Sequence, residues 1–240
     1  MENFNYSKHY NIDAEKFNYF GERYGATSHD EKRVHQFIIS QIPKETESIL
    51  DVGCGSAWVA EYFIKRNKKV ISLDISKVNP LKALNKFPNS NHYGITADSY
   101  SLPFYDNSFD CIIASEIIEH TLYPDKFIKE LLRVLKSGHN LLVSTPYKEI
   151  IRYTLCIHCN KQTPMHAHLH SFDEIILGSL YQNKKPQNFI WITFGNKGLI
   201  FLRTYKLLKY LSFPIWKFID RVTNLIYNIP AHILAIYKKD

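Results

Sequence analysis

The chain has 240 residues, of which 45% are hydrophobic and 22% are charged, so its composition excludes a disordered chain and fits one globular domain. Thirty basic residues against 23 acidic ones give a formal net charge of +7, which permits an anionic partner but also fits scattered, solvated lysines. The polar start of the chain and the absence of a long apolar run predict a cytoplasmic protein without a spanning helix. The four cysteines do not suggest a disulfide framework.

Buried strands and amphipathic helices alternate through the first two thirds of the chain. Apolar spacing predicts helices over 29–41, 56–67 and 124–138, the last ending at Gly138 as its C-terminal stop. Short apolar runs predict strands over 47–55, 68–76, 91–98, 108–118 and 139–147. This alternation is typical of a parallel sheet wound by helices.

The last third continues the pattern with an interruption. A helix is predicted over 171–182, where Ser171 and Glu174 have the spacing of a capping box, and strands are predicted over 187–195 and 230–239. Between these strands, residues 199–228 predict two helices separated at Pro214. Three interpretations of this insertion are open: a packed helical hairpin, a lid over a substrate, or a basic amphipathic surface that rests on a membrane.

Glycines and acids follow three successive strands of the predicted sheet. The stretch "ILDVGCGSAW" places Asp51 at the end of a strand, directly before Gly53 and Gly55. Glycine lets the backbone approach a ligand closely, and the next helix offers free N–H groups. Asp74 ends the second strand, where an acid can accept both hydroxyls of a ribose, and Asp98 follows the third.

These stretches, with "ADSYSLPFYDNSFDCIIASEIIEH" and "LLRVLKSGHNLLVSTP", resemble the class I S-adenosylmethionine-dependent methyltransferases. The resemblance covers residues 46–147 and implies a Rossmann-like, doubly wound, seven-stranded sheet that is mostly parallel, with the last strand antiparallel. It implies that cofactor-binding residues surround the strand ends: Asp51, Gly53 and Gly55 at the amino-acid end, Asp74 at the ribose, Asp98 and Ser99 at the adenine, and Ser115 with Glu116 beside the sulfonium and the acceptor. The chain departs from the family at Ala57 and Trp58, where a third small glycine is usual. A dehydrogenase is the weaker interpretation, because Trp58 replaces the third glycine of the dinucleotide fingerprint.

The resemblance divides one methyltransferase domain, residues 1–240, into four parts. We expect an N-terminal helical cover over 1–45, a cofactor-binding core over 46–198, a helical insertion or lid over 199–228, and the last strand over 229–240.

A cluster of acids and histidines predicts the catalytic centre. Glu116, Glu119 and His120 lie in "SEIIEH", directly after a strand, and the later stretch "MHAHLHSF" follows another strand toward the same edge of the sheet. Carboxylates with imidazoles suit Mg²⁺, Mn²⁺, Fe²⁺ or Zn²⁺. The motif resembles that of ubiquinone-type O-methyltransferases and small-RNA 2′-O-methyltransferases, which implies a cation held by Glu116, Glu119, His120 and a later histidine. His168 is our first choice for that ligand and His170 the second; without a metal, Glu119 or His120 could serve as general base.

A second metal site competes for the same histidines. Cys156 and Cys159 form a C-x-x-C pair, which with His166 or His168 could bind a structural zinc ion. A pair of reduced cysteines in a loop is the simpler alternative.

The resemblance, together with the possible metal site and the basic charge, predicts an S-adenosylmethionine-dependent methyltransferase. We expect it to O-methylate a small polar or anionic acceptor, such as a sugar, a nucleotide-linked sugar or a phosphorylated precursor of a surface glycan. The alternatives are an RNA 2′-O-methyltransferase, and a methyltransferase of a membrane-bound quinone or lipid that contacts the membrane through 199–228. A non-enzymatic module with a degenerate cofactor site is also conceivable, although the intact glycines and acids count against it.

Overall fold

The structure, a computed structural model, describes residues 4–181 and 188–240. Three parts of the predictions lie outside these ranges. They are residues 1–3 of the predicted cover, Gln182 at the end of a predicted helix, and Gln187 at the start of a predicted strand.

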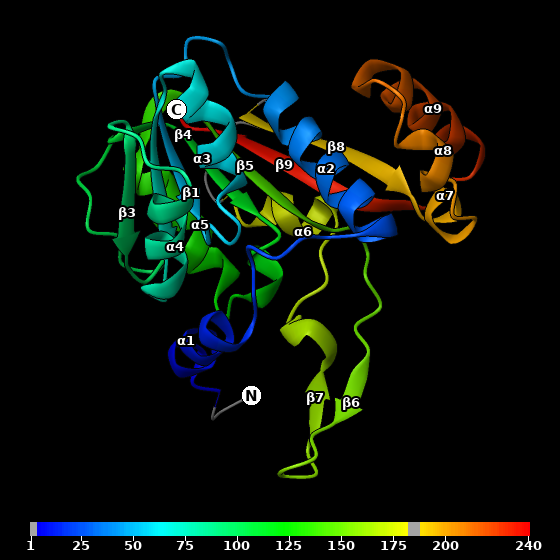
Figure 1. Ribbon diagram of the computed structural model, residues 1–240, viewed down its shortest axis with the longest axis horizontal. Coiled ribbons are helices and arrows are strands. Elements are labelled where there is room, and N and C mark those ends of the chain that lie inside the picture. The colour runs from blue at the N-terminus through cyan, green and yellow to red at the C-terminus, as the bar shows by residue number, and fades with distance from the viewer. Residues whose placement is uncertain (1–3, 182–187) are drawn as a thin grey trace.

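A seven-stranded sheet forms the centre of the molecule (Figure 1). Its strands lie in the order β3-β2-β1-β4-β5-β9-β8. Their bounds are β1 Ser48–Val52, β2 Lys69–Asp74, β3 His92–Thr96, β4 Phe109–Ser115, β5 Leu135–Pro146, β8 Phe189–Asn196 and β9 Pro230–Lys238. The pairs from β3 to β5 are parallel, and β9 runs antiparallel to both β5 and β8. The predicted fold, including its antiparallel last strand, is confirmed.

Helices cover both faces of the sheet, because alternate residues of each strand point to opposite sides. On β1, Leu50 and Val52 pack into a core with helices α5 Pro124–Val134 and α6 Glu174–Ser179. Ile49 packs into the opposite core. The helices that contribute to this second core are α2 Gly25–Ser40, α3 Trp58–Phe63, α4 Val78–Lys86 and α9 Phe213–Ile226. Each fully buried aliphatic side chain contributes about 1.5–3 kcal/mol to folding.

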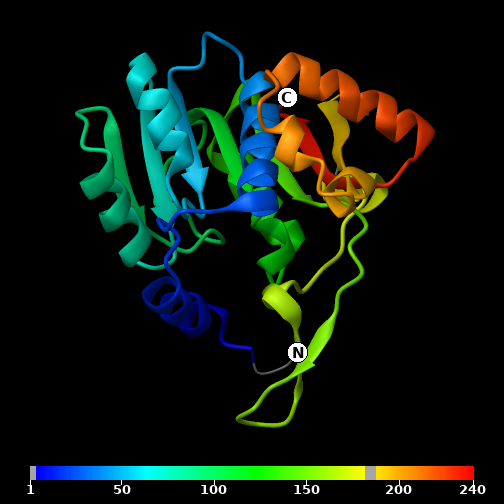
Figure 2. The ribbon, with the colours of Figure 1, turned by 45° about the vertical axis from the view of Figure 1, so that its right-hand side comes forward.

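Two segments project from the same side of the sheet (Figures 1 and 2). One is helix α1, Tyr6–Lys16, near the N-terminus. The other is a separate two-stranded hairpin of β6 Tyr153–Leu155 and β7 Gln162–Pro164, which leads into the 3₁₀ turn η3 Met165–Ala167. They flank the edge where the parallel strands end, which is where ligands bind in folds of this kind.

Two predictions about helix ends are wrong. The helix predicted to Gly138 ends at Val134, because Leu135 already pairs with Phe109 in the sheet; Gly138 lies within β5. The cap of α6 is Asp173, whose carboxylate accepts from the N–H groups of Ile175 and Ile176 at 3.0 and 2.8 Å, so Ser171 is not the cap.

The insertion between β8 and β9 holds three helices in place of the predicted two. They are α7 Lys197–Phe201, α8 Tyr205–Leu208 and α9 Phe213–Ile226. The additional break lies at Arg203, whose φ of 55° is left-handed. Pro214 sits in the first turn of α9, where its missing N–H has no helical partner to lose. Within the described ranges, no helix has both the length and the apolarity needed to cross a membrane.

Candidate functional site

The turn after β1 has the backbone that its glycines predict. Gly53 and Gly55 have φ angles of 67° and 45°, in the left-handed region that other residues rarely adopt. A Cβ atom on Gly53 would lie 2.8 Å from Cγ1 of Ile117 and closer still to its Cδ1. Ala57, which departs from the family pattern, is fully buried and also left-handed, with a φ of 58°, so the turn is preserved at this position without glycine.

Replacing Gly53 with alanine is expected to destabilise the fold through both backbone and packing. Gly138→Ala is the matched control, because its φ of 79° is similar but an added Cβ would meet no atom within 4 Å. Overpacking typically costs about 1–3 kcal/mol, so the free energy of unfolding should fall by that much more in Gly53→Ala than in Gly138→Ala. Urea denaturation of both variants measures this difference. An equal loss of unfolding free energy in the two variants would show that the Ile117 side chain moves aside without cost.

A cavity of about 1000 Å³ opens at the carboxyl ends of the strands. Most of the predicted cofactor residues line it: Asp51, Gly53, Gly55, Asp74, Ser99 and Ser115. Asp98 is not among the lining residues; its carboxylate accepts from the hydroxyl of Tyr6 at 2.5 Å and from the N–H of Tyr100 at 3.0 Å.

The carboxylates at the ends of β1 and β2 differ in their hydrogen bonding. Asp51 is only 2% exposed, and its Oδ2 has no hydrogen-bond partner within the described chain. Burial and the nearby Asp74 raise the pKa of Asp51 well above its ordinary value. Asp74 accepts from the N–H of Ser76 at 2.9 Å and from the amide of Asn79 at 3.0 Å, and burial raises its pKa. A buried, unpartnered carboxylate oxygen at a cavity wall is suited to a bound cation such as an ammonium group.

Helix α1 and the segment after it cover this end of the cavity. Tyr6, Tyr10, Asp13 and Tyr19 all line it, and the hydroxyl of Tyr10 donates to the backbone carbonyl of His120 at 3.0 Å. The sequence indicated a cover over residues 1–45 without identifying these side chains. The aromatic content of this segment was the only available signal.

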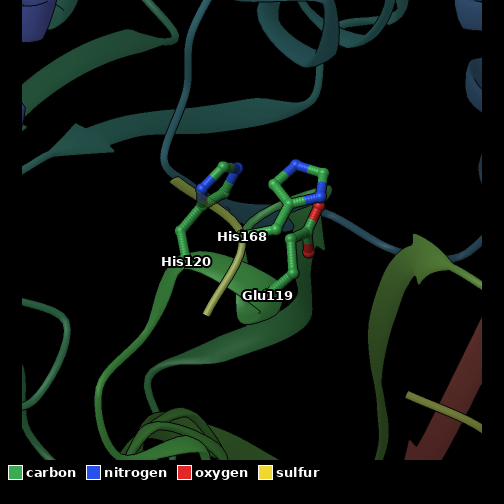
Figure 3. A group of neighbouring side chains, drawn as sticks. All are labelled: Glu119, His120 and His168. Atoms are coloured by element: carbon green, nitrogen blue, oxygen red, sulfur yellow. The ribbon is translucent and has the colours of Figure 1, made fainter. Parts of the chain in front are cut away.

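One acid and two histidines of the predicted centre meet beside the same cavity. Ligand atoms of Glu119, His120 and His168 lie within 4.8 Å of one another, with Glu119 and His120 on the 3₁₀ turn η2 Ile118–His120 and His168 directly after η3 (Figure 3). His120 and His168 line the cavity, whereas Glu119 is 1% exposed and lies behind them. The hydroxyl of Thr145 donates to Oε2 of Glu119 at 2.9 Å.

Each histidine of this group has its Nδ1 atom in contact with an oxygen acceptor. Nδ1 of His168 lies 2.5 Å from a carboxylate oxygen of Glu149, and Nδ1 of His120 lies 3.2 Å from the carbonyl oxygen of Ala167. Both contacts leave the Nε2 atom of the ring uncommitted. Histidines that bind metals in proteins usually donate their other N–H to a carboxylate or a backbone carbonyl in this way. The sequence analysis did not identify Glu149.

Burial shifts the pKa of two members of this group, His120 and Glu119. It lowers the pKa of His120 to about 4, with the neighbouring His168 acting in the same direction, so the His120 imidazole is neutral near pH 7. Burial also raises the pKa of Glu119, and the nearby Glu116 raises it further. A neutral imidazole can bind a metal ion, and a bound cation would favour the ionised carboxylate.

Glu116 lies outside this group, although the motif predicted it as a ligand. Its φ of 55° is left-handed, and its Oε2 lies 3.5 Å from Nδ1 of His232 on β9. Nε2 of His232 lies 2.9 Å from the carboxylate of Asp30 on α2. Burial alone would lower the pKa of His232, but Glu116 and Asp30 outweigh it and raise the value to about 10. Sequence reasoning missed this network, which joins three segments far apart in the chain.

The remaining predicted ligands are placed apart from one another. His170 is not part of the metal-competent group, and its Nε2 is buried without a hydrogen-bond partner in the described chain. Cys156 and Cys159 occupy the turn of the β6–β7 hairpin, where the backbone N–H groups of Cys159 and His158 and the Cys159 thiol lower the pKa of Cys156. His166 lines the cavity beside His168, and no third ligand joins the two cysteines in the described ranges.

Comparison with known proteins identifies the class of this domain. The methyltransferase domain family matches residues 50–143. A mitochondrial ubiquinone biosynthesis O-methyltransferase of Dictyostelium discoideum is 28% identical over 129 residues, 48% of this chain and 40% of that protein. A malonyl-[acyl-carrier protein] O-methyltransferase of Buchnera aphidicola is 38% identical over 98 residues, 41% of this chain and 39% of that protein. The chain therefore spans about two fifths of the length of these curated relatives.

Solved structures share the whole fold at low identity. An S-adenosylmethionine-dependent methyltransferase from Mesorhizobium loti has a TM-score of 0.59 at 14% identity, covering 88% of this chain and 100% of its own. The [4+2]-cyclase SpnF has a TM-score of 0.63 at 18% identity, covering 97% of this chain and 94% of its own. Because one fold can serve different reactions, activity has to be argued from the site. Residues 50–143 match the methyltransferase domain family, and the chain has the fold of solved S-adenosylmethionine-dependent methyltransferases.

Proposed function

We propose that the protein is a methyltransferase that transfers the methyl group of S-adenosylmethionine to an oxygen of a small, hydroxyl-bearing acceptor. One observation carries this proposal: a single cavity is lined both by the glycine turn with Asp51 and Asp74 and by the imidazoles of His120 and His168. A donor and an acceptor bound in the same cavity meet the chief requirement of an in-line displacement, which is close and aligned approach.

The cofactor end of the cavity fits the chemistry of the donor. S-adenosylmethionine supplies an electrophilic methyl group on a positively charged sulfur. The buried carboxylate of Asp51 would accept from the ammonium group, and Asp74 would accept from the ribose hydroxyls. Gly53 and Gly55 leave room for close backbone approach, and Ser99, which lines the same cavity, would face the adenine.

The acceptor end fits a divalent cation held by Glu119, His120 and His168. Such an ion would orient an acceptor hydroxyl and lower its pKa. Two imidazoles with one carboxylate favour Zn²⁺, Fe²⁺ or Mn²⁺ over Mg²⁺, which prefers oxygen ligands. The alternative, in which His120 acts directly as general base, is weaker because a pKa of about 4 makes its imidazole a poor proton acceptor.

The charges that line the cavity favour a small acceptor over a nucleic acid. Six aspartates and glutamates are among its described lining residues, whereas Arg23 is the one lysine or arginine there. Part of this acidity is compensated, because Glu116 and Asp30 flank His232 and raise its pKa to about 10. An RNA backbone needs basic contacts, so this lining supports a small hydroxyl compound despite the net charge of +7. The hydroxyl that receives the methyl group would lose its proton, so that the products are a methyl ether, the neutral sulfide of the cofactor and one proton.

An assay with radiolabelled S-adenosylmethionine tests this proposal. Purified protein is incubated with catechols, simple phenols, sugars and a short RNA, with and without added Zn²⁺ or Mn²⁺. We expect label on the oxygen of a small hydroxyl compound, lost with a chelator and restored by the metal. Transfer to RNA alone, or to carbon or nitrogen alone, would contradict the proposed acceptor class.

A further inference from the structure

Helices α7 to α9 expose an unusual amount of apolar surface. Eight large side chains between residues 201 and 227 are each 67–85% exposed: Phe201, Leu202, Leu207, Tyr210, Phe218, Leu225, Ile226 and Tyr227. Single exposed hydrophobic residues are common on soluble proteins, but so many on three consecutive helices indicate an interaction site. We call this group, together with the basic residues among it, the α7–α9 surface; Figure 1 shows its helices at one end of the sheet, beside β8.

Two of these helices are held on the domain, α9 by buried side chains and α8 by hydrogen bonds at its end. Helix α9 buries Trp216 and Asp220 toward the sheet, where Trp216 contacts Phe37 of α2 at a ring distance of 5.9 Å. The buried guanidinium of Arg33 donates to the carbonyls of Leu208 and Leu211 at 2.7 and 3.1 Å. The apolar side chains that face outward on α9 are therefore a second, outer face of the same helix.

The outer face of α9 has helical periodicity. Ile215, Phe218, Val222 and Leu225 follow one another at spacings of three, four and three residues and form one stripe. All four are exposed. An amphipathic helix of this kind normally buries one stripe, and α9 has two, of which the domain covers only the one with Trp216.

The exposed charged side chains of these helices are all basic. Residues 197–228 contain six basic side chains and a single acid. The acid, Asp220, is 2% exposed, and its carboxylate accepts from the backbone N–H groups of Gly195 and Asn196 at 3.2 and 3.0 Å. The charges available to a partner are therefore only positive: Lys197, Arg203, Lys206, Lys209, Lys217 and Arg221.

We propose that the α7–α9 surface docks on an anionic lipid membrane, with its apolar side chains among the acyl chains and its basic side chains at the lipid headgroups. Exposed aromatic and aliphatic residues interspersed with lysine and arginine have the composition of interfacial helices. The positive charge supplies attraction to the negative surface of such a membrane.

This orientation leaves the cavity open. None of its lining residues comes from 197–228, so docking would not block it. Helix α2 lies between the two: its Arg33 holds α8, whereas its Asp30 and Val34 line the cavity. An acceptor that resides in the membrane would thus be one helix away from the acceptor side of the cavity.

Sedimentation with vesicles tests the proposal without any activity measurement. The full chain is mixed with vesicles of phosphatidylcholine alone and with vesicles that also contain phosphatidylglycerol. We expect binding only to the anionic vesicles. A double variant, Phe218→Ser with Leu225→Ser, should lower the partition coefficient by about tenfold or more. Lys206→Gln with Lys209→Gln should lower it by roughly thirtyfold and reduce its dependence on salt.

Matched control variants distinguish docking through the α7–α9 surface from non-specific binding to vesicles. Leu81 on α4 is 56% exposed, and Lys65 lies in the 3₁₀ turn Ile64–Arg66, so both lie outside the α7–α9 surface. The changes Leu81→Ser and Lys65→Gln should therefore leave vesicle binding unchanged. Failure of the folded wild-type protein to sediment would overturn the proposal, as would equal binding by the α7–α9 variants. A concentration-dependent dimer that the Phe218 and Leu225 changes abolish, without vesicle binding, would show instead that a second copy covers this surface.

Discussion

Glu119→Gln is expected to lower the rate of methyl transfer by about 10²–10⁴-fold, which is the usual contribution of a catalytic group that handles a proton or holds a cation. Glutamine has the shape of glutamate and can still accept from the hydroxyl of Thr145, so the fold should be retained. It lacks the negative charge that would bind a metal beside His120 and His168. Elemental analysis and steady-state kinetics on the same preparations measure both consequences, and affinity for S-adenosylmethionine should be unchanged.

Two further variants distinguish the metal site from general damage. Glu149→Gln removes the carboxylate that contacts Nδ1 of His168 and should weaken metal affinity by about 10–100-fold, because outer partners orient metal ligands. Glu116→Gln should retain the metal, since Glu116 lies outside the group and faces His232. Full activity and metal content in Glu119→Gln would contradict the placement of the cation at Glu119, His120 and His168.

Asp74→Ala is expected to weaken binding of S-adenosylmethionine by about 100-fold. Two hydrogen bonds from a ribose to an ionised carboxylate are worth about 1.5–3 kcal/mol each, and at least one would be lost without replacement. The same change removes the acceptor for the N–H of Ser76 and for the amide of Asn79 at the start of α4. Calorimetric titration measures the affinity, and thermal unfolding of the variant without cofactor shows whether α4 has remained in place.

Asp125→Ala provides the control for that experiment, because Asp125 is an exposed acid in the first turn of α5. It should bind the cofactor as the wild-type protein does. Asp74→Asn keeps an acceptor oxygen at the same position and should lose less affinity than Asp74→Ala. If both Asp74 variants bind as tightly as the wild-type protein, the ribose does not lie at the end of β2.

The parts of the fold that were predictable depend on local pattern. Apolar runs ending in glycine or aspartate identify buried parallel strands, and parallel strands bring their carboxyl ends to one edge. This is why Asp51, Asp74 and Ser115 could be expected in one cavity from the sequence alone. The end of α5 at Val134 could not, because the pairing of Leu135 with Phe109 overrides a helical pattern that continues in the sequence.

The sequence predicts which types of residue form the candidate site, but it does not predict which individual residues come together there. Glu116 and Glu119 have the spacing of one helical face, yet the left-handed backbone at Glu116 turns its side chain toward His232. Glu149 and Asp30 meet histidines 19 and 202 residues away, and no local signal encodes such contacts. The sequence analysis ranks His168 before His170 as the later ligand, and the structure brings His168 to Glu119 and His120.

Calorimetric titration of the purified wild-type protein with S-adenosylmethionine is the most direct test of the central claim, that the cavity between the glycine turn and Glu119, His120 and His168 holds a methyl donor. The account predicts saturable binding of one molecule per chain, with little change when Glu119 is replaced by glutamine and a large loss when Asp74 is replaced by alanine. A folded protein that does not bind S-adenosylmethionine would contradict it.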